Sequence, residues 1–242
     1  MVWGISEPRG FGEFFLSGKL EGQVSTSGPS GWRARLMQYY DELSPEEQKS
    51  LFDGGPGTSY VSFVGRKFYS EIGEKVWPDY PPSSAIATHE PPRSFTLERW
   101  AKAIGSLFTI GNQIWVVEEA LKVIIERLEP GLHQFFPIEI RKRNGEDYPK
   151  EYYIIVIGQY FDSFSPENSK SWCFKLDYPQ FHYKSSKEGV SGLALRKSVF
   201  GNAHLWRERR IIGFLDCCSD ELIAEINGAG LRIPKHYRMI EA

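Results

Sequence analysis

The sequence predicts an α+β protein in which a helical N-terminal region is followed by a mainly antiparallel sheet flanked by short helices. Three observations lead to this fold class. Apolar residues recur at helical spacing between residues 32 and 52. Two apolar runs flank Asn144-Gly145, a dipeptide typical of turns between antiparallel strands. A strongly amphipathic segment at residues 117–128 has the period of a helix.

The first helices are expected between residues 31 and 53. Residues 1–30 are rich in glycine and serine and are expected to form loops. Trp32, Leu36 and Tyr40 fall on one face of a predicted helix. A second helix is predicted to follow Ser44, because Ser44-Pro45-Glu46-Glu47 has the pattern of a capping box with proline at the first helical position.

Residues 60–110 give weaker signals. Alternating residues at 60–65 predict a short strand. Five prolines within residues 77–94 predict an extended connection, and residues 95–107 are expected to contain a helix. We therefore expect two parts, a helical and loop-rich N-terminal region at residues 1–110 and an α+β domain at residues 111–242.

The segment from residue 114 is expected to begin with a buried strand or with the lead into a helix. The helix that follows has one apolar stripe and one charged stripe, and Pro130-Gly131 ends it. Its apolar positions are Val117, Leu121, Ile124, Ile125 and Leu128, and its charged positions are Glu118, Glu119, Lys122, Glu126 and Arg127.

Strands dominate the remaining predictions. Residues 135–140 and 152–157 form the expected antiparallel pair around the Asn-Gly turn. Further strands are expected at residues 172–176, 193–200 and 204–206.

One more helix is predicted near the C-terminus. It follows an apolar run at residues 211–215, begins after a capping Ser219 and ends at Gly228. Residues 114–140 and 211–234 therefore share a plan of apolar run, helix, glycine and apolar run. This shared plan suggests a weak internal repeat.

Composition limits the classes of function. The formal net charge is −2, so the chain lacks the basic excess of a dedicated nucleic-acid-binding protein, and a nucleic-acid partner is not expected. The N-terminus lacks the pattern of a signal peptide, and no apolar stretch approaches the ~20 residues of a membrane span. We expect a cytoplasmic protein with reduced cysteines and no membrane association.

No motif for catalysis is present. The chain has neither a dinucleotide-binding nor a phosphate-binding glycine motif, and no GxSxG nucleophile motif. We therefore expect no enzyme activity, no catalytic residues, no cofactor and no metal. Two arrangements stay open: convergence of Cys173, His182 and His204 on a metal ion, and acid–base pairs formed by Asp162 with Asp177 or by Glu139 with Glu151, for which solvated charges are the stronger interpretation.

Two clusters of basic residues have several interpretations. Arg141-Lys142-Arg143 precedes the Asn-Gly turn, and Arg207, Arg209 and Arg210 follow a predicted strand. Each cluster could bind phosphates, lie in solvent at a strand end, or border a site for an acidic partner.

Several motifs from Trp115 onward occur together in one known family. A short apolar run enters an acidic helix, a Phe-Phe-Pro segment follows, and a tyrosine-rich strand comes next. The chain from Trp115 to the C-terminus resembles the MXAN-type immunity protein domain, which is encoded beside secreted bacterial toxins. The matching segments are Val116-Val117-Glu118-Glu119-Ala120-Leu121, Gln134-Phe135-Phe136-Pro137-Ile138, Tyr152-Tyr153-Ile154-Ile155, residues 211–222, and Gly230-Leu231-Arg232-Ile233-Pro234.

This resemblance implies a non-enzymatic immunity protein, or antitoxin, whose partner is a cognate protein toxin of a polymorphic toxin system. Residues 111–242 would then be an immunity-like domain. We expect partner-binding residues on the acidic helix face, at Glu118, Glu119 and Glu126, where a basic toxin surface would bind. We expect aromatic anchors at Phe135, Phe136, Tyr152 and Tyr153.

Other interpretations of the same residues stay open. The acidic residues could form a solvated helix face, and the aromatic residues could belong to core strands. The alternative functions are a nucleic-acid-binding module that uses the two arginine clusters, an enzyme with an unrecognised dispersed site, and a scaffold protein. The sequence leaves the oligomeric state undetermined.

Overall fold

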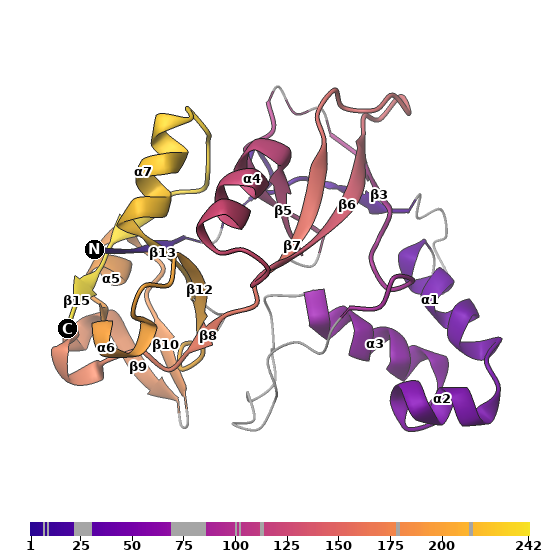
Figure 1. The fold of residues 1–242 in the computed structure, drawn as a ribbon, viewed down its shortest axis with the longest axis horizontal. Coiled ribbons are helices and arrows are strands. Elements are labelled where there is room, and N and C mark those ends of the chain that lie inside the picture. Colours follow the sequence, from indigo (N-terminus) through magenta and orange to yellow (C-terminus); the bar gives the residue numbers. More distant parts are fainter. Residues whose placement is uncertain are drawn as a thin grey trace.

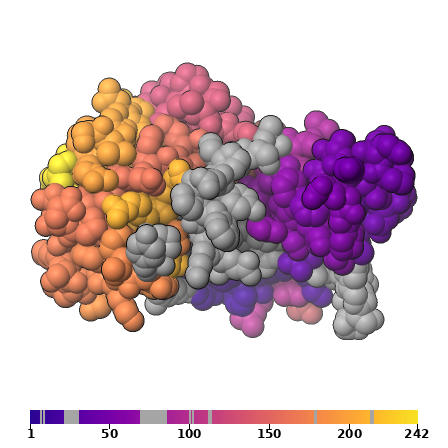
Figure 2. Space-filling view, turned by 90° about the horizontal axis from the view of Figure 1, so that it is seen from below, coloured from indigo at the N-terminus to yellow at the C-terminus, as the bar shows by residue number. Residues whose placement is uncertain are grey.

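A computed structural model describes residues 1–6, 8, 10–21, 31–68, 86–99, 101, 103–111, 114–177, 180–212 and 215–242. The fold contains both helices and mostly antiparallel sheets. Two large sheets stand side by side, with the helices of residues 32–68 at one end of the molecule and residues 174–177 and 180–183 at the other (Figures 1 and 2). No helix in the described part of the chain is long and apolar enough to cross a membrane.

Three helices follow one another in the N-terminal half. They are α1 (Trp32–Asp41), α2 (Pro45–Phe52) and α3 (Gly57–Phe68). The first two confirm the predictions, and the capping box at Ser44 is present in full. The strand predicted at residues 60–65 is wrong. Tyr60, Val64 and Phe68 are buried on one face of α3 at helical spacing, and this period outweighs the short alternation.

The first large sheet has six strands in the order β2 (Gly18–Leu20), β3 (Ser94–Leu97), β6 (Gln134–Arg141), β7 (Tyr152–Val156), β5 (Ile114–Glu118) and β4 (Leu107–Ile110). The hairpin predicted around the Asn-Gly turn is confirmed as β6 and β7. The helix expected at residues 95–107 is wrong, because β3 and the start of β4 occupy its described ends. The loop prediction for residues 1–30 is wrong at β2 and at β1 (Val2–Ile5).

The second large sheet has five strands in the order β14 (His236–Arg238), β1 (Val2–Ile5), β13 (Leu215–Ser219), β12 (Leu205–Glu208) and β8 (Tyr160–Phe161). Helix α7 (Asp220–Gly228) begins after Ser219, whose side chain accepts a hydrogen bond from the Leu222 amide. This cap confirms the prediction, as α4 (Glu119–Leu128) does for the amphipathic helix.

Short elements complete the C-terminal half. They are η1 (Pro166–Asn168), η2 (Ser171–Cys173), β9 (Phe174–Asp177), β10 (Gln180–Tyr183), α5 (Lys187–Ser191), β11 (Ala194–Leu195), α6 (Lys197–Phe200) and β15 (Ile240–Glu241). The strand predicted at 204–206 is confirmed as part of β12. The strand predicted at 172–176 is correct only for its later part, β9, because η2 precedes it. The strand predicted at 193–200 is correct only for its early part, β11, because α6 follows it.

Three apolar clusters form the core of the part of the chain that the structure describes. One lies between α1–α3 and the near face of the six-stranded sheet. The second contains the apolar sides of α4 and α7 together with side chains from both large sheets. The third fills the far side of the five-stranded sheet, beneath β9, β10 and α5. The two large sheets therefore share one apolar layer, the second cluster, while each also covers a cluster of its own.

The two halves of the chain repeat one topology. The series β3, β4, β5, α4, β6 has its counterpart in β11, β12, β13, α7 and the pair β14–β15. Val117 of β5 pairs with β4 on one side and β7 on the other, and Cys218 of β13 pairs in the same way with β12 and β1. The repeat suggested by residues 114–140 and 211–234 is therefore present in the structure and extends well beyond them.

The parallel strand pairs repeat in the same register. Phe95 of β3 pairs with Ile140 of β6, and Leu195 of β11 pairs with Glu241 of β15. The positions of β7 and β1 show that the repeats exchange strands. The first strand of the chain, β1, lies within the second sheet, while β7 from the second half lies within the first sheet (Figure 1). Separation of the halves would therefore expose unpaired backbone in both sheets.

The repeats differ in what is inserted before β3 and before β11. Leu20 pairs with Phe95 in the first repeat, and Phe164 pairs with Leu195 in the second. Helices α1–α3 lie between these partners in the first repeat, whereas residues 166–193 lie between them in the second. We call residues 166–193 the second insert. The boundary expected at residue 110 stays a prediction, because independent folding of residues 1–110 and 111–242 is a separate property from strand pairing.

Candidate partner-binding site

The acidic side of α4 continues onto α7. The Lys122 ammonium lies 3.4 Å from a carboxylate oxygen of Glu119 and 3.4 Å from one of Glu126. Arg127 binds Glu225 of α7 at 2.9 Å and thereby links the two helices, which lie side by side (Figure 1). We call the outward surface of these helices the α4–α7 face. It is formed by Glu119, Lys122, Val123, Glu126, Arg127, Asp220, Glu221, Ala224 and Glu225.

The chemistry of the α4–α7 face suits a basic protein surface. Its carboxylates outnumber its cations, and both of its cations are already paired within the face. Val123 is 51% exposed and supplies an apolar contact point among the charges. A face of this kind attracts a positively charged partner over a distance and fixes its orientation.

Tyr153 on β7 borders the α4–α7 face. The Lys122 ammonium lies 4.5 Å from the centre of the Tyr153 ring. A hydrogen bond with the Glu119 carboxylate raises the pKa of the Tyr153 hydroxyl to about 12. The structure therefore brings together three of the predicted site residues, namely Glu119, Glu126 and Tyr153.

Glu118 lies elsewhere, although it precedes Glu119 in the chain. Its side chain is 6% exposed and accepts hydrogen bonds from Lys150 at 2.6 Å and from Ser106 at 2.8 Å. These contacts join the end of β5 to residues beside β4 and β7. Glu118 thus serves as an internal link, because a buried carboxylate of this kind requires its partners.

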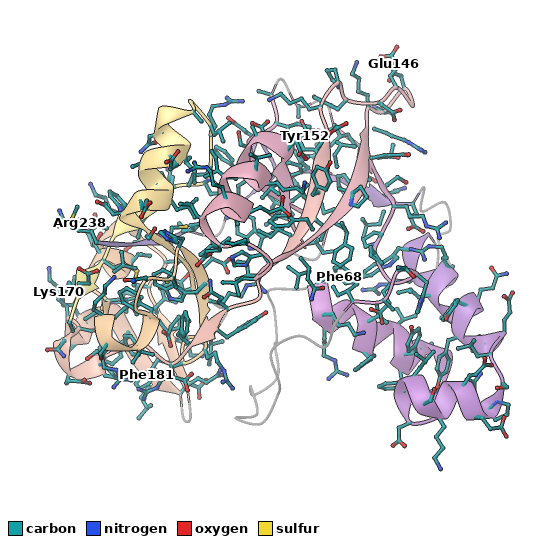
Figure 3. All side chains as sticks on the ribbon, in the orientation of Figure 1. Phe68, Glu146, Tyr152, Lys170, Phe181 and Arg238 are labelled. Carbon is teal, nitrogen blue, oxygen red and sulfur yellow. The ribbon has the colours of Figure 1, made fainter. Side chains whose placement is uncertain are left out.

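The four predicted aromatic anchors do not form one patch. Phe135 and Tyr153 face the cluster beneath α4, whereas Phe136 and Tyr152 face the cluster beneath α1–α3. Phe136 meets Phe68 edge to face, with ring centres 6.2 Å apart. Tyr152 is buried, which raises the pKa of its hydroxyl. Figure 3 shows Tyr152 in the sheet, with Phe68 at the end of α3.

Several of the basic residues in the two arginine clusters are paired with carboxylates. Arg207 is buried, and its Nε donates to Asp216 at 2.8 Å. Arg141 binds Glu139, and Lys142 binds Glu146 at 3.0 Å on the exposed turn after β6. These carboxylates compensate the charges that a phosphate would need.

The possible metal ligands lie in separate surroundings. The Cys173 thiol is buried in the third apolar cluster, and burial raises its pKa. The His182 ring binds Asp177 at 2.9 Å, and His204 binds Ser219 at 2.9 Å. Nowhere in the described ranges do three or more histidine, cysteine or carboxylate side chains form a group that could hold a metal ion.

Sequence reasoning missed a buried polar link between the repeats. The Glu129 carboxylate accepts hydrogen bonds from His133 at 2.7 Å and Gln159 at 2.6 Å, and from the amides of His204 and Leu205 at 2.6 and 3.0 Å. Burial alone would raise the pKa of Glu129, but these donors hold it below its ordinary value. No local pattern signals this link, because its members come from segments far apart in the chain.

A comparison with known protein families gives a match. The family described as Immunity protein family (Imm11) matches residues 49–239. No curated protein matches the chain. The match includes the region before residue 115, to which the resemblance seen in the sequence did not extend, and it covers most of both structural repeats. The chain therefore belongs to the Imm11 immunity protein family.

Proposed function

We propose that this protein neutralises a cognate secreted bacterial toxin by binding it directly. Membership of an immunity protein family carries this proposal. The interpretation requires no catalysis by the chain, and it places neutralisation in the cytoplasm of the cell that the protein protects. Immunity complexes can be among the tightest known, with dissociation constants near 10⁻¹³ M or below for colicin nuclease pairs, to take an order of magnitude.

The α4–α7 face is our proposed contact surface. Its excess of carboxylates would speed association with a basic toxin surface. Val123 and Tyr153 would supply contact area at its centre and border. Of the residues predicted from sequence, Glu119, Glu126 and Tyr153 stay in this proposal. The buried Glu118 would support the face from below.

The first experiment tests neutralisation itself. The chain is produced together with the product of the neighbouring toxin gene, and growth and co-purification are measured. Rescue of growth together with a stable complex is the expected outcome. A toxin that still arrests growth, or that never co-purifies with the chain, would contradict direct neutralisation.

The second experiment tests the α4–α7 face. Glu119→Lys with Glu126→Lys is expected to lower the association rate about tenfold at low ionic strength, because it removes the attraction for a basic surface. Glu42→Lys with Glu46→Lys, at exposed positions at the end of α1 and the start of α2, provides a charge-matched control. Equal association rates for the two double variants would exclude the α4–α7 face and leave neutralisation by another surface.

A further inference from the structure

The β9–β10 hairpin of the second insert has a free backbone edge. The Lys184 amide donates a hydrogen bond to the Cys173 carbonyl. From this pair onward, hydrogen-bonded and non-hydrogen-bonded residue pairs alternate along the hairpin. Phe181, which lies opposite Leu176, turns its amide and carbonyl away from β9 and toward Arg210 and Ile212. By the antiparallel pattern, the amide and carbonyl of Leu176 point away from β10.

Phe174 has the same orientation as Leu176, because the two residues are two positions apart on one strand. No described residue pairs with the outward backbone groups of either residue. Two strands of the large sheets have partners along the corresponding edge. Residues 14–16 pair with β4, and β8 covers the edge of β12. The β9 edge is therefore open to an added strand.

Exposed apolar side chains lie beside this edge. Leu176 is 57% exposed and Trp172 is 47% exposed. The base of the hairpin is well packed, since Phe174 and Phe181 meet Phe164 with ring centres 5.3 and 4.9 Å away. Leu176 on the hairpin and Trp172 on η2 are thus exposed beside a packed base, an arrangement typical of residues that anchor a partner.

Lysines outnumber carboxylates in the second insert, which contains four lysines and the three acidic residues Glu167, Asp177 and Glu188. Lys170, Lys175, Lys184 and Lys187 are exposed and have no carboxylate partner in the described ranges. The Lys184 ammonium lies 5.4 Å from the centre of the Trp172 ring. In the first repeat, Lys122, Lys142 and Lys150 each bind a carboxylate. An acidic partner would complement the second insert.

We propose that the β9 edge binds an extended, acidic segment of the cognate toxin, which joins the hairpin as a third strand. The proposal rests on the function proposed above and assigns that function a second contact surface. An extended polypeptide matches the alternating amide and carbonyl groups of an edge strand. A nucleic acid does not, since the outward carbonyls would face its phosphates.

The structural repeat accounts for the position of this surface. The insertion point is shared, but the first repeat carries helices α1–α3 there. Helices satisfy their own backbone groups and leave no edge. Lys170 and Phe181 lie at the end of the molecule opposite these helices (Figure 3). The inserts can therefore carry separate contacts while the repeated framework stays the same.

Binding of the toxin encoded beside this gene tests the proposal with the full-length chain. The amides of Phe174 and Leu176 are expected to exchange hydrogen more slowly in the complex. Leu176→Asp is expected to weaken binding at least about tenfold, by analogy with other anchor residues. Leu51→Asp, at an exposed leucine of α2, is the matched control and should bind as the parent does.

Charge reversal tests the basic surround separately. Lys175→Glu with Lys184→Glu is expected to slow association about tenfold at low ionic strength. Arg33→Glu with Lys49→Glu, on α1 and α2, is the charge-matched control. Thermal unfolding of every variant shows whether a loss of binding comes from misfolding. A milder variant, Leu176→Ser, tests the same side chain with less disturbance of the hairpin.

The outcomes separate this proposal from the proposed function. The edge proposal is overturned if all hairpin variants bind and neutralise the toxin as the parent does and the β9 amides exchange hydrogen no more slowly in the complex. The immunity function would then stay in place. Absence of toxin binding by the parent chain would overturn both. A third outcome concerns nucleic acid. If the parent retains a single-stranded oligonucleotide, and if Lys175→Glu with Lys184→Glu abolishes that retention but not toxin binding, the lysines bind nucleic acid and the proposal is overturned.

Discussion

At the scale of single residues, Glu208 stands out among the described carboxylic acids because its pKa is raised. Its side chain is buried at the end of β12. It accepts hydrogen bonds from the Ser163 amide at 2.8 Å, the Ser163 hydroxyl at 2.6 Å and the Arg210 amide at 3.0 Å. Burial outweighs these donors and raises the pKa of Glu208 to about 7.

This shift makes stability depend on pH. Between pH 4.5 and 7 the folded state keeps a proton on Glu208 that the unfolded state has released, so the free energy of unfolding falls as pH rises. The loss attributable to Glu208 should approach roughly 3 kcal/mol above pH 7. Urea denaturation across pH 4 to 8 should show this slope in the parent and a flatter profile in Glu208→Gln.

A matched control separates Glu208 from the other carboxylates. Glu188→Gln changes an exposed carboxylate of α5 and should leave the pH profile as in the parent. Equal slopes in Glu208→Gln and in the parent would show that Glu208 is not the group responsible.

At the scale of elements, the two equivalent helices α4 and α7 begin in different ways. Ser219 caps α7, accepting from the Leu222 amide at 3.1 Å and bonding His204 at 2.9 Å. Glu118, at the matching position before α4, makes no side-chain cap. Its carboxylate is engaged with Ser106 and Lys150 instead. The same position of the repeat therefore caps a helix in one half, as Ser219, and links strands in the other half, as Glu118.

Removal of the α7 cap should destabilise the whole protein, because α7 packs into the apolar cluster shared by the two sheets. Ser219→Ala is expected to lower the free energy of unfolding by about 1 kcal/mol. Urea denaturation measures this change. Ser44→Ala removes the equivalent cap from α2, which buries no side chain, and should mainly speed local hydrogen exchange there. A larger global effect from Ser44→Ala than from Ser219→Ala would contradict this assignment.

At the scale of the whole molecule, strand exchange joins the halves. β1 pairs with both β13 and β14, and β7 pairs with both β5 and β6. The Glu129 cluster and a hydrogen bond from Trp115 to Asp216 at 2.8 Å add links between them. Trp115 and Asp216 occupy equivalent positions in β5 and β13, so this contact lies where the two repeats meet.

Cleavage between the repeats should therefore leave them together. A protease site inserted between Asn144 and Gly145 lies in an exposed turn between β6 and β7. After digestion of the folded protein, residues 1–144 and 145–242 are expected to co-elute in native buffer and to separate only in denaturant. Separation into two folded fragments in native buffer would show that the exchanged strands do not hold the halves together.

Local elements of the fold could be predicted because their signals are local. Helices α1, α2, α4 and α7 were predicted from period and capping, and the β6–β7 hairpin from its Asn-Gly turn. β1 and β2 were missed, since each is short and owes its pairing to a strand far away in the chain. At the candidate site, Glu119 and Glu126 were placed on an outward helix face, but the burial of Glu118 depends on Lys150 and Ser106.

The sequence by itself determined the composition class, most of the helices, one hairpin and membership of an immunity protein family, because periodicity, caps, turns and motifs are properties of neighbouring residues. Only the tertiary structure decided which aromatic side chains share a face, which charges are buried, and that the two halves exchange their first strands. Those features arise from contacts between residues distant in the chain, and hydrogen bonding and burial at such contacts have no local pattern.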